Sequence, residues 1–143
     1  MSAYDPNNIF AKILRGEIPC EKVYEDANTI AFMDVMPRAD GHVLVLPKRG
    51  ARNLLDVPPD VLSTLILSVQ KIARAVKAGM DAEGITVHQF NEPAGGQSVF
   101  HIHFHVIPRW DGVGLGHHAA TMADPADLKA HAEKIRAALA AGA

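Results

Sequence analysis

Hydrophobic and polar residues alternate strictly from Phe100 to Val106, which is the period of a β-strand. His101, His103 and His105 therefore fall on one face of the predicted strand, about 6.6 Å apart at a rise of about 3.3 Å per residue. The apolar residues of the stretch fall on the opposite face, where they can be buried. A solvated strand face usually carries mixed polar residues, so three imidazoles within five residues indicate a reaction surface.

Four more strands are predicted from short alternating or apolar runs. They span residues 22–25, 29–33, 42–46 and 85–90, and turn-forming residues separate the first two. Residues 109–123 are interrupted by glycines and are predicted to form a loop.

Helical periodicity is clearest over residues 60–78, where apolar residues recur three and four positions apart. This spacing predicts a long amphipathic helix that ends near Gly79. A short helix is predicted over residues 7–15, because its apolar residues share one face and a glycine follows. A last helix is predicted after Asp124, a favourable N-cap that is followed by Pro125.

The order of these elements predicts an α+β fold. Five strands in short succession, with one long helix between the third and the fourth, favour an antiparallel sheet with helices packed on one face. The other face is then available to a ligand. A doubly wound sheet would need strands and helices to alternate throughout, and they do not. At 143 residues, the chain is long enough for a single domain, residues 1–143, with its own core.

Composition narrows the possible functions. The net charge of −2 argues against non-specific binding of nucleic acid, which needs a basic surface. The single cysteine, Cys20, excludes an internal disulfide and suits a reducing cytoplasm. The sequence shows neither a signal peptide nor an apolar run near the roughly 20 residues of a membrane span. We therefore predict a cytoplasmic protein that is not bound to a membrane.

The histidines allow three interpretations. Satisfied polar residues on a solvated face would be the default for one histidine, but less so for three at this spacing. A zinc site is the second, because neutral imidazole is a common ligand. No His-Glu-x-x-His or Cys-x-x-Cys pattern accompanies the histidines, however. The third is phosphate chemistry, since imidazole can attack phosphorus while imidazolium groups neutralise phosphoryl oxygens. Gln97, Ser98 and the backbone of residues 95–96 would supply further donors.

Residues 94–107 resemble the signature of the histidine triad (HIT) family, in which His-x-His-x-His precedes two apolar residues. The order and spacing of further segments are similar to the Hint-like purine nucleoside phosphoramidase branch of that family. These segments are residues 9–10, 16–19, 24–26, 32–34 and 41–48. The resemblance covers roughly residues 5–110 and leaves out a C-terminal loop and helix, residues 111–143.

The resemblance implies a nucleotide-binding hydrolase or transferase that acts on purine nucleotides. It also implies a homodimer with a five-stranded sheet in each subunit. By the same resemblance, His103 is the nucleophile that takes the nucleotidyl group onto its ring nitrogen. His105 contacts the α-phosphate, and His101 and His42 support the other two.

The resemblance also assigns the rest of the pocket. Asn91, Gln97 and Ser98 match polar groups around the phosphate and the leaving group, and Asp34 matches the acid that binds ribose. The apolar base pocket corresponds to Ile9, Phe10, Ile13, Ile18 and Phe32. From the residues alone, Asp34 would equally cap a turn, and the five apolar residues would equally be core. The remaining histidines match no functional position and are predicted to be surface or loop residues: His88, His117, His118 and His131.

One departure from the family pattern concerns zinc. Many bacterial members carry Cys-x-x-Cys and a later histidine at positions that are Asn8, Ala11 and Gly50 here. We therefore expect no structural zinc, no catalytic metal and no cofactor. The region after Trp110, which shapes substrate choice in the family, matches poorly and leaves the substrate open.

The predicted reaction is hydrolysis of nucleoside 5′-phosphoramidates, or related nucleotidyl conjugates, through a nucleotidyl-histidine at His103. The leaving amine needs a proton, which a neighbouring imidazolium or the Ser98 hydroxyl would supply. Hydrolysis of dinucleoside polyphosphates by the same histidine is one alternative. A nucleotide-binding module with vestigial catalysis is another, although the intact triad with Gln97 and Ser98 argues against it.

Overall fold

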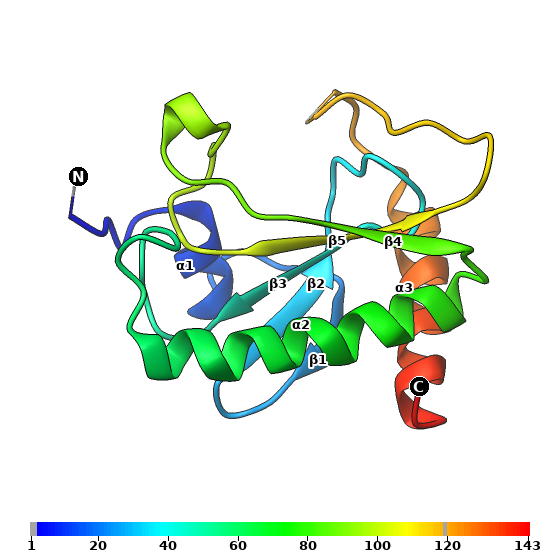
Figure 1. The fold of residues 1–143 in the computed structure, drawn as a ribbon, viewed down its shortest axis with the longest axis horizontal. Coiled ribbons are helices and arrows are strands. Elements are labelled where there is room, and N and C mark those ends of the chain that lie inside the picture. Colours follow the sequence, from blue (N-terminus) through cyan, green and yellow to red (C-terminus); the bar gives the residue numbers. More distant parts are fainter. Residues whose placement is uncertain (1–2, 119) are drawn as a thin grey trace.

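The computed structural model describes residues 3–118 and 120–143, which form one antiparallel sheet of five strands with three α-helices (Figure 1). The elements are α1 (Ile9–Leu14), β1 (Lys22–Glu25), β2 (Thr29–Met33), β3 (Val43–Pro47), α2 (Pro59–Gly79), β4 (Gly84–His88), the 3₁₀ turn η1 (Pro93–Gly95), β5 (Phe104–Arg109) and α3 (Pro125–Ala140). The strand order is β1-β2-β3-β5-β4. The predicted α+β class, with a long helix between the third and fourth strands, is confirmed.

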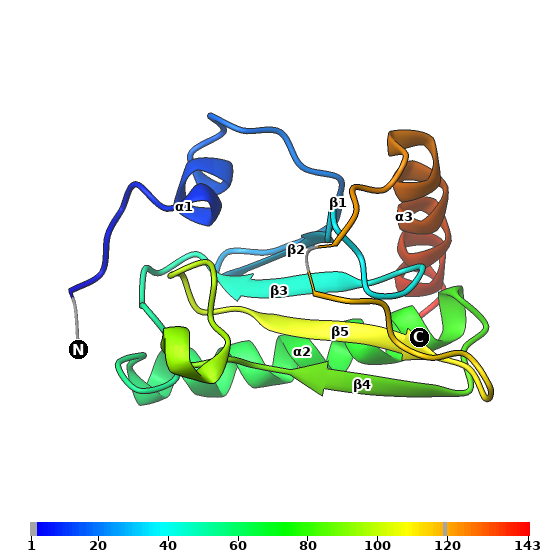
Figure 2. The same cartoon turned by 90° about the horizontal axis from the view of Figure 1, so that it is seen from above.

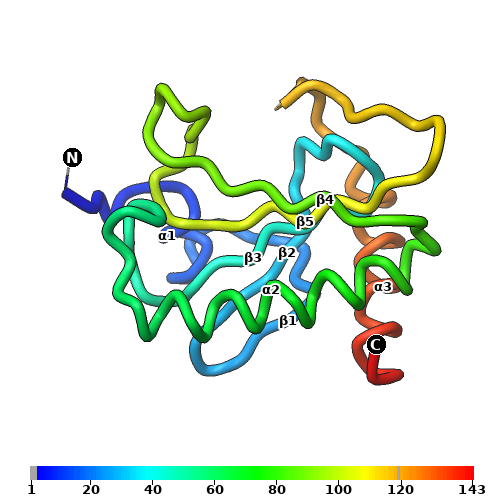
Figure 3. Tube along the Cα trace, viewed as in Figure 1, coloured from blue at the N-terminus to red at the C-terminus, as the bar shows by residue number. Residues whose placement is uncertain are grey.

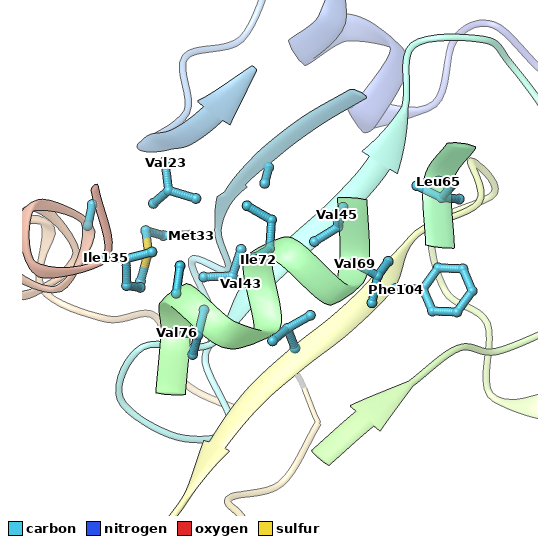
Figure 4. Packing of buried hydrophobic residues seen from close by; sticks show 14 of the residues in the cluster. Val23, Met33, Val43, Val45, Leu65, Val69, Ile72, Val76, Phe104 and Ile135 are labelled. Carbon is cyan, nitrogen blue, oxygen red and sulfur yellow. The ribbon is translucent and has the colours of Figure 1, made fainter. Parts of the chain in front are cut away.

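Helix α2 covers one face of the sheet along its length (Figure 1). Because strand residues alternate between faces, β3 sends Val43 and Val45 toward α2, whose Val69 and Ile72 lie in the same cluster (Figure 4). Helix α3 closes the end of this core through Ile135. This core fixes the sheet from one side, so the opposite face is held in a defined position.

The opposite face of the sheet carries its own apolar cluster. The residues that β2 and β3 send to this side are Ile30, Phe32, Leu44 and Leu46, and Phe10 of α1 packs on them. Helix α1 begins where the Asn8 side-chain oxygen accepts the Ala11 amide N–H at 2.9 Å. The expectation that all helices share one face was therefore wrong for α1, which covers part of the face predicted to hold the ligand.

The histidine strand is shorter than predicted. Strand β5 begins at Phe104, so His101 and His103 precede it and only His105 lies within it. The pairing of Val45 with Phe104 is the last on the β3 side. Continuing that register would pair Leu46 with His103 and Pro47 with Ile102, and Pro47 has no amide N–H to extend the ladder. The Ile102 amide instead donates to the Ala51 carbonyl at 2.8 Å. Ile102 and Phe104 still point into the α2 core.

The loop after β5 crosses over the loop between β2 and β3. The Gly116 amide donates to the Arg38 carbonyl at 2.8 Å, and the Arg38 Nε donates back to the Gly116 carbonyl at 3.0 Å. Figures 2 and 3 show both loops on the side of the sheet away from α2. Asp124 then caps α3 as predicted, accepting the Ala126 amide at 2.8 Å. Among the described residues, no helix is long and apolar enough to cross a membrane.

Candidate active site

A cavity of about 290 Å³ opens on the sheet face opposite α2. Its lining includes all five predicted base-pocket residues: Ile9, Phe10, Ile13, Ile18 and Phe32. Asp34, Ser98, His103 and His105 also line it, and so does His118. Residues far apart in the sequence thus combine an apolar pocket with a cluster of imidazoles.

His103 has a defined tautomer. Its Nδ1 lies 2.7 Å from the backbone carbonyl oxygen of His101. A carbonyl can only accept, so Nδ1 carries the proton and Nε2 keeps its lone pair. Burial lowers the pKa of His103 to about 4, and the edge of the Phe10 ring packs against the imidazole at 4.8 Å between centroids. His103 is therefore neutral at pH 7, with the Nε2 lone pair that an attacking imidazole needs.

His42 and His105 form a second hydrogen-bonded pair. The Arg38 backbone N–H donates to His42 Nδ1 at 3.0 Å, so the proton of neutral His42 is on Nε2. This Nε2–H donates to His105 Nδ1 at 2.9 Å. The proton of neutral His105 is consequently on Nε2, which is buried without a hydrogen-bond partner among the described residues. The chain of donors leaves an N–H free for an oxygen atom of a ligand in the cavity.

Asp34 lies beside this pair. One carboxylate oxygen accepts the Met36 amide at 2.8 Å, and the other lies 3.5 Å from His42 Nε2. Burial raises the pKa of the Asp34 carboxyl and lowers the pKa of His42 to about 3. Because His42 is neutral, this contact is a polar one and not an ion pair.

His101 lies behind the cavity and is fully buried. Its Nε2 donates to the Pro47 carbonyl at 2.8 Å, so its Nδ1 is an acceptor, and the Tyr4 hydroxyl donates to it at 2.7 Å. Burial lowers the pKa of His101 as well. The side chain therefore braces the segment that carries His103.

Comparison with known proteins agrees with this geometry. The family model described as "HIT domain" matches residues 15–112. The chain belongs to the HIT family. It is 40% identical over 115 residues to a Candida albicans protein named adenosine 5′-monophosphoramidase, a match that covers 76% of each chain.

Solved structures of HIT proteins also superimpose closely. A Hit-like protein from Bartonella henselae is 55% identical, with a TM-score of 0.89, and the match covers 95% of this chain and 99% of that one. A zinc-bound histidine triad protein from Mycobacterium smegmatis is 35% identical, with a TM-score of 0.82 and 94% of both chains covered. The phosphoramidase-like resemblance is thus confirmed at the level of family and fold.

The three positions that the family resemblance linked to zinc hold Asn8, Ala11 and Gly50. Asn8 caps α1 and Ala11 is buried in that helix. A side chain at position 50 would have its Cβ 2.6 Å from the Tyr4 ring. None of the three positions offers a thiolate or an imidazole, so these residues do not fit a structural zinc ion.

Asp34, His42 and His105 place three potential metal ligands within 4.8 Å of one another. The facing nitrogens of His42 and His105 already share a proton in a hydrogen bond, however, and His42 Nδ1 already accepts a backbone N–H. The donor set therefore suits a hydrogen-bond relay better than an ion.

Two predicted pocket residues lie outside the cavity lining. The buried Gln97 amide donates to the Arg52 and Val99 carbonyls at 2.7 and 3.1 Å. Asn91 accepts the Leu54 amide at 2.8 Å. Both side chains brace the loops around η1 and before α2.

Sequence reasoning gave no role to His118, although it lines the cavity. Its Nε2 lies 3.3 Å from the Ser98 hydroxyl oxygen, and its ring centroid is 6.1 Å from that of His105. His88 was also left out, and its Nδ1 lies 3.4 Å from the Arg38 guanidinium near the same loop crossing. The glycine-rich loop has no periodicity from which the position of His118 in the cavity could be predicted. The presence of two adjacent histidines, His117 and His118, was the only sequence feature that pointed to this loop.

Because four histidines are buried, we expect the free energy of unfolding to fall steeply in acid. Burial lowers the pKa of His42, His101, His103 and His105 in the folded protein, to about 3, 4 and 2 for the first, third and fourth. Below a pH of about 6.5 the unfolded chain takes up protons that the folded protein does not. Each such proton lowers the free energy of unfolding by roughly 1.4 kcal/mol per pH unit.

Urea unfolding at several pH values between 7.5 and 5 should therefore show stability falling steadily as the pH drops. The stability of the control variant His117→Ala, which changes an exposed histidine, should fall by the same amount as that of the wild type. A stability that stays constant over this range would show that the four imidazoles are not held neutral.

Proposed function

We propose that the protein hydrolyses purine nucleoside 5′-phosphoramidates through a nucleotidyl-His103 intermediate. One observation carries the proposal: the unprotonated Nε2 of His103 and the unpartnered Nε2–H of His105 belong to adjacent rings, 5.0 Å apart between centroids, in the wall of one cavity. A nucleophile next to an unused hydrogen-bond donor suits attack on a phosphoryl group. The name of the Candida albicans relative supports the same reaction class.

In the first step, His103 Nε2 forms a bond to the α-phosphorus as the P–N bond breaks and the leaving nitrogen takes up a proton. The His105 Nε2–H donates to a phosphoryl oxygen as charge develops there. The His101 carbonyl, which accepts the Nδ1–H at 2.7 Å, stabilises the positive charge that the His103 ring gains. In the second step, water attacks phosphorus, releases the nucleoside monophosphate and restores neutral His103.

The leaving nitrogen needs a route for its proton. Ser98 and His118 both line the cavity, with 3.3 Å between the hydroxyl oxygen and Nε2. In this proposal Ser98 passes a proton to the leaving group and is resupplied by His118. His118 would take a proton back when water attacks in the second step.

The apolar part of the cavity is assigned to the purine base. Phe10 and Phe32 form an edge-to-face pair at 5.5 Å between centroids, next to Ile9 and Ile13. Among the described lining residues, Asp34 is the one carboxylate, and it is assigned to the ribose hydroxyls.

Cys20 also lines the cavity, and burial raises the pKa of its thiol. A free thiol suits the cytoplasmic location that we propose.

Turnover of adenosine 5′-phosphoramidate, followed by release of AMP, tests the proposal. We expect faster hydrolysis of this substrate than of a diadenosine polyphosphate, and unchanged turnover after treatment with EDTA. Tight AMP binding without turnover would favour the binding module, and faster cleavage of the polyphosphate would favour the other hydrolase. Activity that is lost with EDTA and restored by zinc would contradict the metal-independent mechanism.

We also propose that the protein is a homodimer. The loop before α2 and the outer side of that helix expose large apolar residues, among them Leu55 and Leu67, at 68% and 67%. Val87 is exposed on β4, which is an edge strand of the sheet. Exposed apolar side chains and a free strand edge suit a protein interface.

Light scattering at micromolar concentration should give twice the 15.4 kDa mass of the chain. The variant Leu67→Glu should shift the mass to that of a monomer. The control variant Val113→Glu changes an exposed valine in the C-terminal loop and should leave the dimer intact. A wild-type protein of monomer mass would refute this proposal.

A further inference from the structure

Tyr4 connects the N-terminal segment to the histidine triad. Its hydroxyl lies 2.7 Å from His101 Nδ1 and 3.1 Å from Asn8 Nδ2. Its ring packs edge-on against the His101 imidazole, at 5.6 Å between centroids. Gly50 admits the ring, because a Cβ at that position would approach it to 2.6 Å. The tyrosine is thus fixed by packing and by hydrogen bonds at the same time.

The direction of each hydrogen bond in this chain is determined. The Pro47 carbonyl can only accept, so His101 donates from Nε2 and accepts at Nδ1. The Tyr4 hydroxyl is therefore the donor to His101, and the Asn8 amide donates to the Tyr4 oxygen. Asn8 also caps α1 through its side-chain oxygen. One chain of donors runs from the N-cap of α1 to the His101 ring.

The segment that holds His103 depends on such anchors. Residues 98–103 form no strand pairing in the described structure. His101 is instead held at both ring nitrogens, and its backbone carbonyl accepts the His103 Nδ1–H. A displacement of His101 would move this carbonyl and turn the His103 ring.

We propose that Tyr4 is a positioning residue for the nucleophile: through His101 it sets the orientation of His103, and through Asn8 it ties this orientation to α1. Helix α1 carries Phe10, whose ring packs against the His103 imidazole. The base pocket and the nucleophile are thereby fixed to the same hydrogen-bond chain. This role rests on the proposed function, because it assumes that His103 is the reacting group.

The variant Tyr4→Phe tests the proposal, because it keeps the ring and removes only the hydroxyl. With adenosine 5′-phosphoramidate we expect kcat to fall about 10- to 100-fold, since small misplacements of a reacting group have effects of this size. KM should stay within about threefold of the wild type. The matched control is Tyr24→Phe, which removes the hydroxyl of the other tyrosine, bonded to Asp26, and should leave both constants unchanged.

A second variant, Asn8→Asp, separates positioning from folding. Aspartate keeps the oxygen that caps α1, but it replaces the amide donor by a carboxylate that would accept the Tyr4 proton itself. We expect kcat to fall as in Tyr4→Phe while the melting temperature stays at least as high as that of Tyr4→Phe. An equal kcat in the wild type and in both variants would overturn the proposal, and so would an equal loss in Tyr24→Phe.

Nuclear magnetic resonance of the ligand-free protein distinguishes failure of this proposal from failure of the proposed function. In Tyr4→Phe, the ¹⁵N resonance of His101 Nδ1 should shift, and the His103 Nδ1 proton should exchange faster with solvent. Both changes are expected whatever substrate the protein uses. If neither occurs, Tyr4 does not position the triad, even if the wild type hydrolyses the phosphoramidate.

Discussion

The variant His103→Ala is expected to lose turnover, with kcat lower by on the order of 10³-fold or more, because the proposed reaction depends on a bond between His103 Nε2 and phosphorus. AMP affinity should stay within about tenfold of the wild type, since the apolar pocket, Asp34 and the His105 donor remain. Steady-state kinetics with adenosine 5′-phosphoramidate and calorimetric titration with AMP measure the two quantities.

A labelling experiment accompanies this variant. The wild type, mixed with substrate and quenched in alkali, should carry an acid-labile nucleotidyl group, and His103→Ala should carry none. The control variant His117→Ala, in the exposed loop, should behave as the wild type. Hydrolysis by His103→Ala at close to the wild-type rate would show that another group attacks phosphorus.

The next largest effect is expected from His105. The variant His105→Leu removes the buried Nε2–H that is unpartnered in the described structure, and kcat should fall about 10²- to 10³-fold, as when one donor to a developing oxyanion is lost. The variant His105→Gln keeps an N–H donor on a side chain of similar length. It should recover about tenfold of this loss.

The same two variants also test whether the hydrogen bonds that run from the Arg38 backbone through His42 to His105 contribute to catalysis. Melting temperatures of both variants control for loss of packing beside His42 and Phe90. If the leucine and glutamine variants lose the same activity, His105 contributes packing and not a hydrogen bond. In that case the relay from the Arg38 backbone through His42 has no catalytic role.

Features with a local period were predicted well from the sequence. The apolar spacing of residues 60–78 predicted α2 to within one residue at each end. The alternation around the histidines placed Ile102 and Phe104 on the α2 side and His103 and His105 in the cavity wall. A local period predicts the structure because residues on one face of a helix or strand all contact the same surface.

Features set by distant neighbours were not predicted. The start of β5 depends on Pro47 of another strand, which no pattern near residue 104 reveals. The contact between Tyr4 and His101 joins residues 97 positions apart. The place of His118 depends on how its loop crosses Arg38, through backbone hydrogen bonds that carry no side-chain signature. These features depend on tertiary packing, so the parts of the site that they determine could not be predicted from the sequence.

The stereochemical course at phosphorus tests the nucleotidyl-histidine most directly. A single diastereomer of an adenosine 5′-thiophosphoramidate, hydrolysed in ¹⁸O-labelled water, gives a product whose configuration at phosphorus can be determined. Two successive in-line displacements, by His103 and then by water, predict overall retention of configuration. Inversion would mean that water attacks the substrate directly, and it would contradict the covalent mechanism.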